Sequence, residues 1–600
     1  MFSLSHDKNP CKLRFMRRVC CWKEPENAVC SLQELFRRRK SSIVLLALAL
    51  TGIVLLLYHT HSKVVVEAEA EEQREYLAII NQLNRNQQKS LKMRLLEKSI
   101  KKPEIVVVQD RTPQETVSAP APSVAAQNSR YVHSSMKLGL ALKTQHTSNQ
   151  TAIVEAIKHA WSAYTKYAWG ADEVKPVSMT SFTPSYGLGM TLIDCLDTLW
   201  LVGLQDEFDE AREWVANSLD IEGNTKRVSL FETNIRVLGG LLGAYHLSLD
   251  NLFLDKAVEL ARHLLPAFDT PSGVPSPIVN LKYGLKTSSG QRGIRPLSVA
   301  EAGTLQLEFR DVSKASGDSS FQTACDKDMN VLLEQGRGSM MPSMINPSSG
   351  RLHATGFSVG AGIDSYYEYL LKQWIQSGKT ESKFVTAYTS SVKDIASHLV
   401  GHSLPSNLAF IGRANTRGTF PSGWMDHLSC FYPGMLALGL MNGLHPEQRP
   451  LASDLTQTCY TAYSKTPSGL APEIFHFNMQ EGGDDFVMRG VQSTDLSNIL
   501  RPETVESLFY QYRLTKDSRY RDWGWKIFQA FEKHTRIETG GYSGVFSVLN
   551  TNKKQDKMES FFISETLKYL FLLFSDDPDV LKLDEWVLNT EAHPFPVWKL

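Results

Sequence analysis

The sequence lacks an excess of charge of either sign: its 600 residues hold 64 lysines and arginines against 64 aspartates and glutamates. Without a basic field, the chain has no electrostatic basis for holding nucleic acid. It also contains no EF-hand loop, no His/Cys cluster with zinc spacing and no metalloprotease motif, so spacing alone predicts no metal site. A convincing series of alternating strands is missing as well, which favours a helical architecture.

Long apolar runs are scarce, and the one that stands out extends from Ser41 to Tyr58. At about 18 residues it is at the short end for a membrane-spanning helix. Residues 1–40 are basic and end in four consecutive cationic side chains, which predicts a cytosolic tail and a luminal remainder. A cleaved signal peptide is the alternative, but the leading segment is too long and no small-residue cleavage site follows. The sequence therefore predicts a type II membrane protein with a single transmembrane signal-anchor at 41–58.

Cysteine is also scarce, with eight residues in the whole chain. Four of them fall in the predicted tail, where disulfides are not expected and plain thiols are the default over palmitoylation or zinc binding. Past the apolar run, Cys195 lies in an apolar helical stretch, which is typical of a buried free thiol, while the state of Cys325 stays open. The other two luminal cysteines are Cys430 and Cys459.

Residues 59–150 have the composition of a luminal stem. A charged, helix-favouring part has an apolar seam too short for a coiled coil, and a stretch rich in Pro, Ala and Ser after it marks a flexible spacer. The stem ends at a sequon, Asn149-Gln150-Thr151, which predicts a glycan on Asn149. From residue 151 to 600 the chain is expected to form one large helical domain.

Seven short stretches share one plan, in which carboxylates enter an apolar helical run. In the clearest one, Pro502 suits the first turn of a helix, so a helix is expected to begin there. Glu503 and Glu506 then lie on one face of that turn. The positive end of the helix dipole favours an ionised carboxylate at that position. The other six stretches are 192–200, 231–238, 299–305, 363–369, 425–428 and 558–565.

These stretches recur roughly every 40 to 80 residues, which is enough for a helical hairpin and a loop. Acids at the same end of seven helices predict a ring whose polar ends converge on one pocket. The alternative is an open helical solenoid with solvated helix tips, in which each acid is only a cap.

Several of the stretches carry long motifs of a known family. FETNIRVLGGLLGAY (231–245), DSYYEYLLKQWI (364–375), LRPETVESLFY (500–510) and NTEAHP (589–594) resemble the class I α-1,2-mannosidases, glycoside hydrolase family 47. The resemblance implies an all-α fold with an (α/α)7 barrel. It also implies inverting hydrolysis of terminal α-1,2-linked mannose from high-mannose N-glycans. Details of the second motif are more similar to the endoplasmic-reticulum members than to the Golgi members.

Cleavage with inversion needs an acid on the leaving oxygen and a carboxylate that activates water, held roughly 6.5 to 9.5 Å apart. Acids from different helices of a ring suit this, whereas two acids on one turn would be too close. By the resemblance, Glu503 corresponds to the general base, Glu232 to the general acid and Asp364 to a third essential carboxylate. For each of them, the structural alternative is an acid bonded to the N–H groups of a neighbouring helix.

The resemblance implies further pocket residues. Arg236, one turn after Glu232, is expected to pair with a carboxylate or a sugar, and Phe561 matches an aromatic ring under the sugar. For His427, a satisfied core histidine is the alternative to a role in the site. The other matched polar positions are Glu301, Glu473, Arg501, Glu506, Glu565 and Glu591.

A calcium ion and a disulfide follow only from the resemblance. It implies that Ca²⁺ binds through Thr590 of NTEAHP and grips two adjacent hydroxyls of the terminal mannose. A lone threonine would not suggest a metal by itself. The resemblance also implies a Cys430–Cys459 disulfide.

One position departs from the endoplasmic-reticulum members, which carry an arginine two residues before the aspartate matched by Asp364. Here that position is Gly362, which predicts relaxed branch selectivity and leaves both the endoplasmic reticulum and the Golgi membrane as locations. Two other functions stay open: a mannose-recognising quality-control or degradation factor with weak hydrolysis, and a scaffold without a ligand. The three core acids are all present, which favours the enzyme.

Overall fold

The computed structural model describes residues 146–599, apart from 184–185, 287–294, 337–338, 354–355, 416–421 and 578. The predicted tail (1–40), membrane span (41–58) and nearly all of the stem (59–150) lie outside these residues. Within them, none of the helices combines the length and the apolar character that crossing a bilayer requires. The expected helix-rich fold is confirmed.

Seven of the described helices each bury a single stripe. In α9, for example, Phe253, Ala257, Leu260 and Leu264 are buried at helical spacing while the opposite face is polar. Such helices cover a surface from outside. They are α3 (Ser148–Ala168), α6 (Gln205–Asn217), α9 (Asn251–Leu264), α12 (Ser319–Gly336), α14 (Ser382–His398), α16 (Arg449–Ser464) and α18 (Arg519–Thr535).

The segments that alternate with them along the chain are buried on nearly all sides, as in α8, α13 and α17. Five of the seven are joined from short pieces, and three of these five include a 3-10 or π-helical turn. They are α4 (Met190–Asp194) with α5 (Leu196–Leu201); α7 (Leu230–Glu232), η2 (Thr233–Leu238) and α8 (Gly239–Ser248); α10 (Val299–Gly303) with α11 (Gln306–Ser316); α13 (Asp364–Gln376); η4 (His427–Phe431) with α15 (Tyr432–Met441); α17 (Glu503–Thr515); and η6 (Phe562–Leu567) with α19 (Lys568–Leu573).

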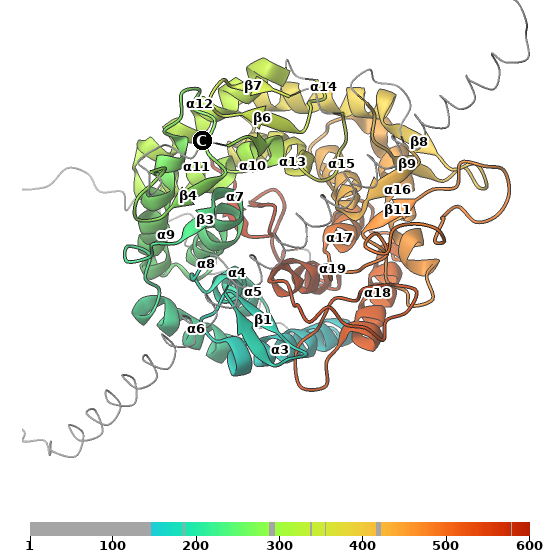
Figure 1. The fold of residues 1–600 in the computed structure, drawn as a ribbon, viewed down its shortest axis with the longest axis horizontal. Coiled ribbons are helices and arrows are strands. Elements are labelled where there is room, and N and C mark those ends of the chain that lie inside the picture. Colours follow the sequence, from blue (N-terminus) through green and yellow to red (C-terminus); the bar gives the residue numbers. More distant parts are fainter. Residues whose placement is uncertain are drawn as a thin grey trace, which may run out of the picture. The chain divides into compact units, whose positions relative to one another are not determined.

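The buried segments form a closed inner ring (Figure 1). Contacts pass from α5 to α8, to α10 and α11, and on through α13, α15 and α17 to α19; η6 then returns to α5. Each inner segment also packs against an outer helix, from α5 on α6 to α19 on α3. An open solenoid is therefore excluded for the described part of the chain.

Short strands, which the sequence analysis did not predict, lead into several inner segments. Each has two or three residues, and all pairs are antiparallel; β3, β5 and β10 end where α7, α10 and η4 begin. Within residues 541–546 only isolated bridges form, at Tyr542 and Val545. The strands are β1 (Glu173–Lys175), β2 (Thr180–Phe182), β3 (Arg227–Ser229), β4 (Ile278–Asn280), β5 (Leu297–Ser298), β6 (Met344–Asn346), β7 (Arg351–Leu352), β8 (Val400–His402), β9 (Ala409–Ile411), β10 (Trp424–Asp426), β11 (Ile474–His476), β12 (Trp586–Leu588) and β13 (Pro594–Pro596).

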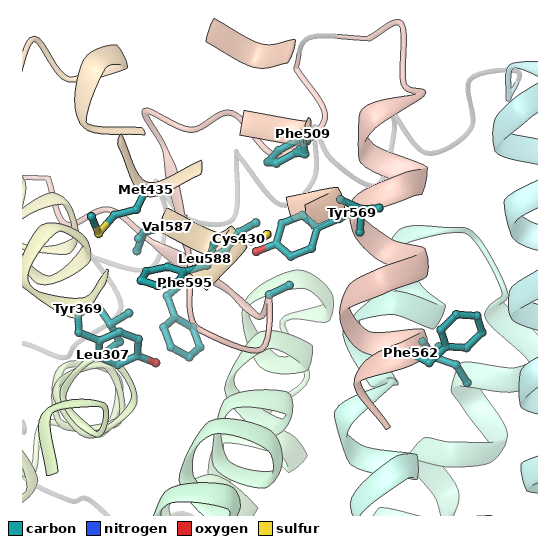
Figure 2. Packing of buried hydrophobic residues seen from close by; sticks show 14 of the residues in the cluster. Leu307, Tyr369, Cys430, Met435, Phe509, Phe562, Tyr569, Val587, Leu588 and Phe595 are labelled. Carbon is teal, nitrogen blue, oxygen red and sulfur yellow. The ribbon is translucent and has the colours of Figure 1, made fainter. Parts of the chain in front are cut away.

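The C-terminal hairpin β12–β13, dark red in Figure 1, occupies the middle of the ring, where it contacts α13 and α8. Its side chains Val587, Leu588 and Phe595 are buried and lie near Tyr369 and Leu307 of the inner helices (Figure 2). The turn between the two strands, residues 589–593, is thereby placed inside the ring.

Candidate active site

A cavity of about 270 Å³ opens among the starts of the inner segments. Its lining comes from α7 and η2, α10, α13, η4, α17, η6 and the turn before β13. Of the predicted site residues, it contains Glu232, Arg236, Glu301, Asp364, Arg501, Glu503, Glu506, Phe561, Glu565, Thr590 and Glu591. Eleven residues, chosen from separate parts of the chain, thus meet at one place.

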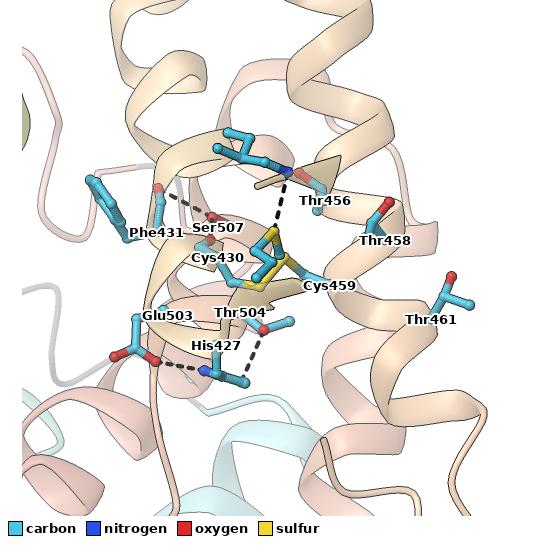
Figure 3. Close-up of a disulfide and its surroundings, with 12 residues drawn as sticks. His427, Cys430, Phe431, Thr456, Thr458, Cys459, Thr461, Glu503, Thr504 and Ser507 are labelled. Atoms are coloured by element: carbon cyan, nitrogen blue, oxygen red, sulfur yellow. Dashed lines mark hydrogen bonds and ion pairs between the residues drawn. A yellow bond between two sulfur atoms is a disulfide. The ribbon is translucent and has the colours of Figure 1, made fainter. Parts of the chain in front are cut away.

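Two predicted residues, His427 and Glu473, lie behind the lining. His427 is buried, and its Nδ1 lies 2.8 Å from Glu503 Oε2 (Figure 3). Its Nε2 lies 3.0 Å from the Tyr463 hydroxyl. Glu473 accepts a hydrogen bond from Arg501 Nε at 2.6 Å. Both therefore position residues that face the cavity, and His427 is also the satisfied core histidine of the alternative interpretation.

Glu503 is held as a carboxylate. The helix α17 begins at Glu503, with Pro502 as its N-cap, one residue later than expected. Burial by itself raises the pKa of Glu503, but the hydrogen bond from His427 and the charge of Arg501, 3.6 Å away, outweigh it, so the pKa lies below its ordinary value. The sequence predicts an ionised Glu503, and the lowered pKa agrees with this prediction. His427 and Arg501 contribute more to the lowering than the start of the helix does.

Asp364 also starts an inner helix, yet its state is the opposite. Burial raises the pKa of Asp364 to about 7, and the nearby charges of Glu368 and Glu503 add to the rise. Its one opposing contact is the N–H of Ser365, which donates to Oδ1 at 2.9 Å. The site therefore pairs a carboxylate whose pKa is lowered with a carboxyl group whose pKa lies near 7, the combination that acid–base catalysis needs.

Arg236 faces the cavity from the π-helical turn η2, a feature frequent at functional sites, and Glu232 ends α7 directly before that turn. Arg236 Nε donates to Glu232 Oε2 at 2.7 Å, and its Nη1 donates to Glu591 Oε2 at 2.9 Å. Its guanidinium also lies 5.5 Å from the centre of the Phe561 ring. Arg236 therefore pairs with carboxylates, one of the two expected roles.

Glu301 has a structural role despite its place in the lining. Its Oε2 accepts from Ser298 N–H at 2.8 Å and Ser298 Oγ accepts from the N–H of Glu301, which makes a capping box on α10. Its carboxylate is thus engaged with the backbone as a cap.

Buried carboxylates surround Thr590 at the bottom of the cavity. Thr590 Oγ1 donates to Glu368 Oε2 at 2.9 Å. Burial, followed by repulsion from Glu368, raises the pKa of Glu506 to about 8, and burial raises that of Glu591 to about 8. Burial and the neighbouring acids also raise the pKa of Glu565 well above its ordinary value.

This excess of acid fits a hard divalent cation. Among the described residues, the ion pairs of these acids are those of Arg236 with Glu591 and of Lys372 with Glu368. Oxygen donors of this kind suit cations such as Ca²⁺. No group of three or more His, Cys, Asp or Glu side chains in the described residues is arranged to hold a metal directly. Thr590 lines the same cavity as Glu506, Glu565 and Glu591, so their oxygens are the donors that a cation there would meet.

The acids of two predicted stretches do not reach the cavity. Asp194 and Asp197 are fully buried beneath it, where His593 bridges them at 3.1 and 3.0 Å and Lys568 binds Asp197. Asp426 is buried beside the cavity wall. The predicted convergence thus holds for the acids of five stretches out of seven.

Glu368 was missed by the sequence analysis although it lies in a recognised stretch. It is four residues after Asp364 on α13, so both share one helix face, which is the signal that could have identified it. Ser298, Leu428 and Phe431 also line the cavity, but nothing in their local sequence distinguishes them.

The disulfide expected from the resemblance is present. Cys430 of η4 is bonded to Cys459 of α16, close to His427 and Glu503 (Figure 3). Cys195 is a buried free thiol, as expected, and Cys325 is one as well. Asn149 lies in the first turn of α3, and its glycan remains a prediction.

Comparison with known proteins gives consistent relatives. Endoplasmic reticulum mannosyl-oligosaccharide 1,2-alpha-mannosidase of Rattus norvegicus is 50% identical over 454 residues, which cover 75% of this chain and 68% of the relative. The Homo sapiens protein of that name is 49% identical over 456 residues, and 64% of its length is spanned. The solved α-1,2-mannosidase from Trichoderma reesei is 30% identical with a TM-score of 0.69, covering 75% of this chain and 99% of that one.

The family model described as glycosyl hydrolase family 47 matches residues 156–597, which include every segment of the inner ring. The extent of this match and the identity to the relatives assign the chain to one family. The chain belongs to glycosyl hydrolase family 47.

Proposed function

We propose that the protein is a mannosyl-oligosaccharide α-1,2-mannosidase that hydrolyses terminal α-1,2-linked mannose from high-mannose N-glycans with inversion. The observation that supports this best is the joint placement of Glu232, Asp364 and Glu503 in one cavity above Thr590. The relatives named above carry this activity in their names. The ring of alternating inner and outer segments fits an (α/α)7 barrel as its catalytic domain.

Glu503 acts as the general base. Its carboxylate is ionised because His427 and Arg501 hold it, so it can take a proton from the attacking water. Asp364 holds a proton near neutral pH, which suits donation to the leaving oxygen. Glu232, the donor that the family resemblance implies, is the more exposed acid and bonds Arg236. Phe561 offers a flat apolar face for the sugar ring.

Calcium is the cation that this proposal assigns to the bottom of the cavity, held by Thr590 with Glu506, Glu565 and Glu591 in the surrounding wall. When bound, it supplies Lewis-acid attraction for two hydroxyls of the terminal mannose. Arg236 keeps Glu591 in place at 2.9 Å, and Glu368 orients the Thr590 hydroxyl at 2.9 Å.

We further propose a location in the membrane of the endoplasmic reticulum or the Golgi, with the catalytic domain in the lumen. The apolar run at 41–58 with its basic flank supports the anchor. The disulfide suits an oxidising compartment.

The test is release of mannose by the full-length chain from a high-mannose glycan, with and without a chelator. Activity that chelation abolishes and calcium restores is expected, and proton NMR of the first mannose released should show the β-anomer that inversion gives. Binding without release would support the alternative, a mannose-recognising quality-control factor. The same digest tests the effect of Gly362, since a stop after one specific mannose would contradict relaxed selectivity.

The pH dependence of kcat/KM should have two limbs. Glu503 must be ionised, so activity is lost as pH falls through its pKa, which lies below the ordinary glutamate value of about 4.3. Asp364 must be protonated, so activity is lost as pH rises through about 7. A profile that stays flat from neutral into mildly alkaline pH would exclude Asp364 as donor. The D364N variant should lack this alkaline limb in whatever activity it keeps.

A further inference from the structure

The guanidinium group of one arginine is linked to the cavity lining through a single carboxylate. Arg413 follows strand β9, and its Nη2 donates to Asp426 Oδ2 at 2.6 Å. The same oxygen accepts the N–H of Ala361 at 3.1 Å, and Ala361 lines the cavity. Asp426 also directly precedes η4, from which Leu428 lines the cavity. Arg413 is thereby connected to the cavity wall through Asp426 and Ala361.

The Arg413 side chain is presented to solvent in a fixed plane. It is 38% exposed, and its guanidinium lies 4.5 Å from the centre of the Trp424 ring. Stacking of this kind orients the planar fork of donors. The guanidinium carries five N–H donors, and Nη2 uses one of them on Asp426. The exposed part of the stacked plane therefore suits recognition of neighbouring sugar hydroxyls.

The wall next to Arg413 has no long side chain of its own. At Gly360 a Cβ would stand 1.9 Å from Asp426 Oδ2, so no side chain fits there. Gly362 lines the cavity with a φ of 88°, a conformation that disfavours other residues. The cavity of about 270 Å³ is below the roughly 300–1,000 Å³ of sites for drug-sized ligands. It therefore takes a terminal sugar and leaves the rest of a branched glycan at the rim.

We propose that Arg413 determines which arm of a high-mannose glycan is trimmed first, by binding hydroxyls of the sugars beyond the disaccharide that is cleaved. This inference rests on the proposed mannosidase function. A purely structural role is the alternative, in which Arg413 only holds Asp426 and, through it, the backbone at Ala361. The two roles predict different results when Arg413 is replaced. In the first role the loss of activity depends on the size of the substrate, and in the second it does not.

The experiment compares two substrates of the full-length chain, a branched high-mannose glycan and α-1,2-linked mannobiose, which ends after one further sugar. In R413Q, kcat/KM for the glycan should fall about tenfold, the loss expected from one charge-assisted hydrogen bond. The mannobiose value should fall much less, and the order in which glycan isomers appear by mass spectrometry should change.

Arg519 offers a matched control on the outer helix α18. It is 42% exposed, pairs with Asp517 at 3.0 Å and lies 5.6 Å from the centre of the Trp523 ring. R519Q should leave both substrates and the isomer order unchanged. Equal losses on both substrates in R413Q, or no loss on either, would overturn the inference. If the unmodified chain releases mannose from neither substrate, the proposed function itself fails.

Discussion

Replacing Glu503 by glutamine is expected to lower kcat for mannose release by about 10²–10⁴-fold, the contribution typical of a general base. Glutamine keeps the size of the side chain and can still accept the hydrogen bond from His427 Nδ1, so the cavity keeps its shape. The amide cannot take a proton from water. Because a base acts only in the transition state, kcat and kcat/KM should fall together in steady-state assays on a high-mannose glycan.

Glu207 provides the control for this substitution, since it also lies in the first turn of a helix, on the outer helix α6. E207Q should behave as the unmodified chain does. A kcat for E503Q within about tenfold of normal would remove Glu503 from the role of base, because that loss is below the range for general-base catalysis.

The convergence of helix starts could be predicted from the sequence because it depends on a local pattern. An apolar run with acids at its first turn identifies both the buried helix and its polar end, and this was sufficient to gather Glu232, Asp364, Glu503 and Glu506. The same pattern also matched Glu301, which is a cap, and the buried Asp194. Local pattern alone does not separate these cases, because each satisfies the same helix-start preference.

The protonation states could not be predicted, since they depend on tertiary partners. Glu503, Glu506 and Asp364 all lie in first turns, yet the pKa is lowered only for Glu503, the one bonded to His427. His427 comes from η4, 76 residues earlier in the chain, so its position was not readable locally. Helix dipoles contribute less here than burial and direct partners.

Thr590 and the short strands mark two further limits. Nothing in the local sequence of residues 589–593 indicates a pocket; the turn reaches the ring's centre only because β12 and β13 pack on α13 and α8. The strands have two or three residues each, too few for alternation to show. Both features result from contacts between distant segments.

The network beneath Thr590 should be the most sensitive point for stability. Lys568 Nζ donates to both oxygens of Asp197 at 3.0 and 2.9 Å, and both side chains are fully buried. D197N leaves a buried ammonium without its counter-charge, which should cost about 3–5 kcal/mol of unfolding free energy. Comparison of denaturant midpoints with the unmodified chain measures it. The exposed pair Lys158–Glu155, at 3.1 Å, is the control, and E155Q should cost less than about 1 kcal/mol.

A double substitution distinguishes two causes of this cost: the lost attraction between Asp197 and Lys568, and the unpaired charge of the buried ammonium. If the cost of D197N comes mainly from the unpaired ammonium, D197N/K568M should recover much of it, because removing both charges removes the desolvation penalty. Recovery should be incomplete, since Lys568 also donates to Ala592 O at 2.8 Å and His593 loses one of its two carboxylates. A double variant as unstable as the sum of its single variants would instead show that the two side chains contribute independently. In that case the turn carrying Thr590 would be held by β12–β13 packing rather than by charge.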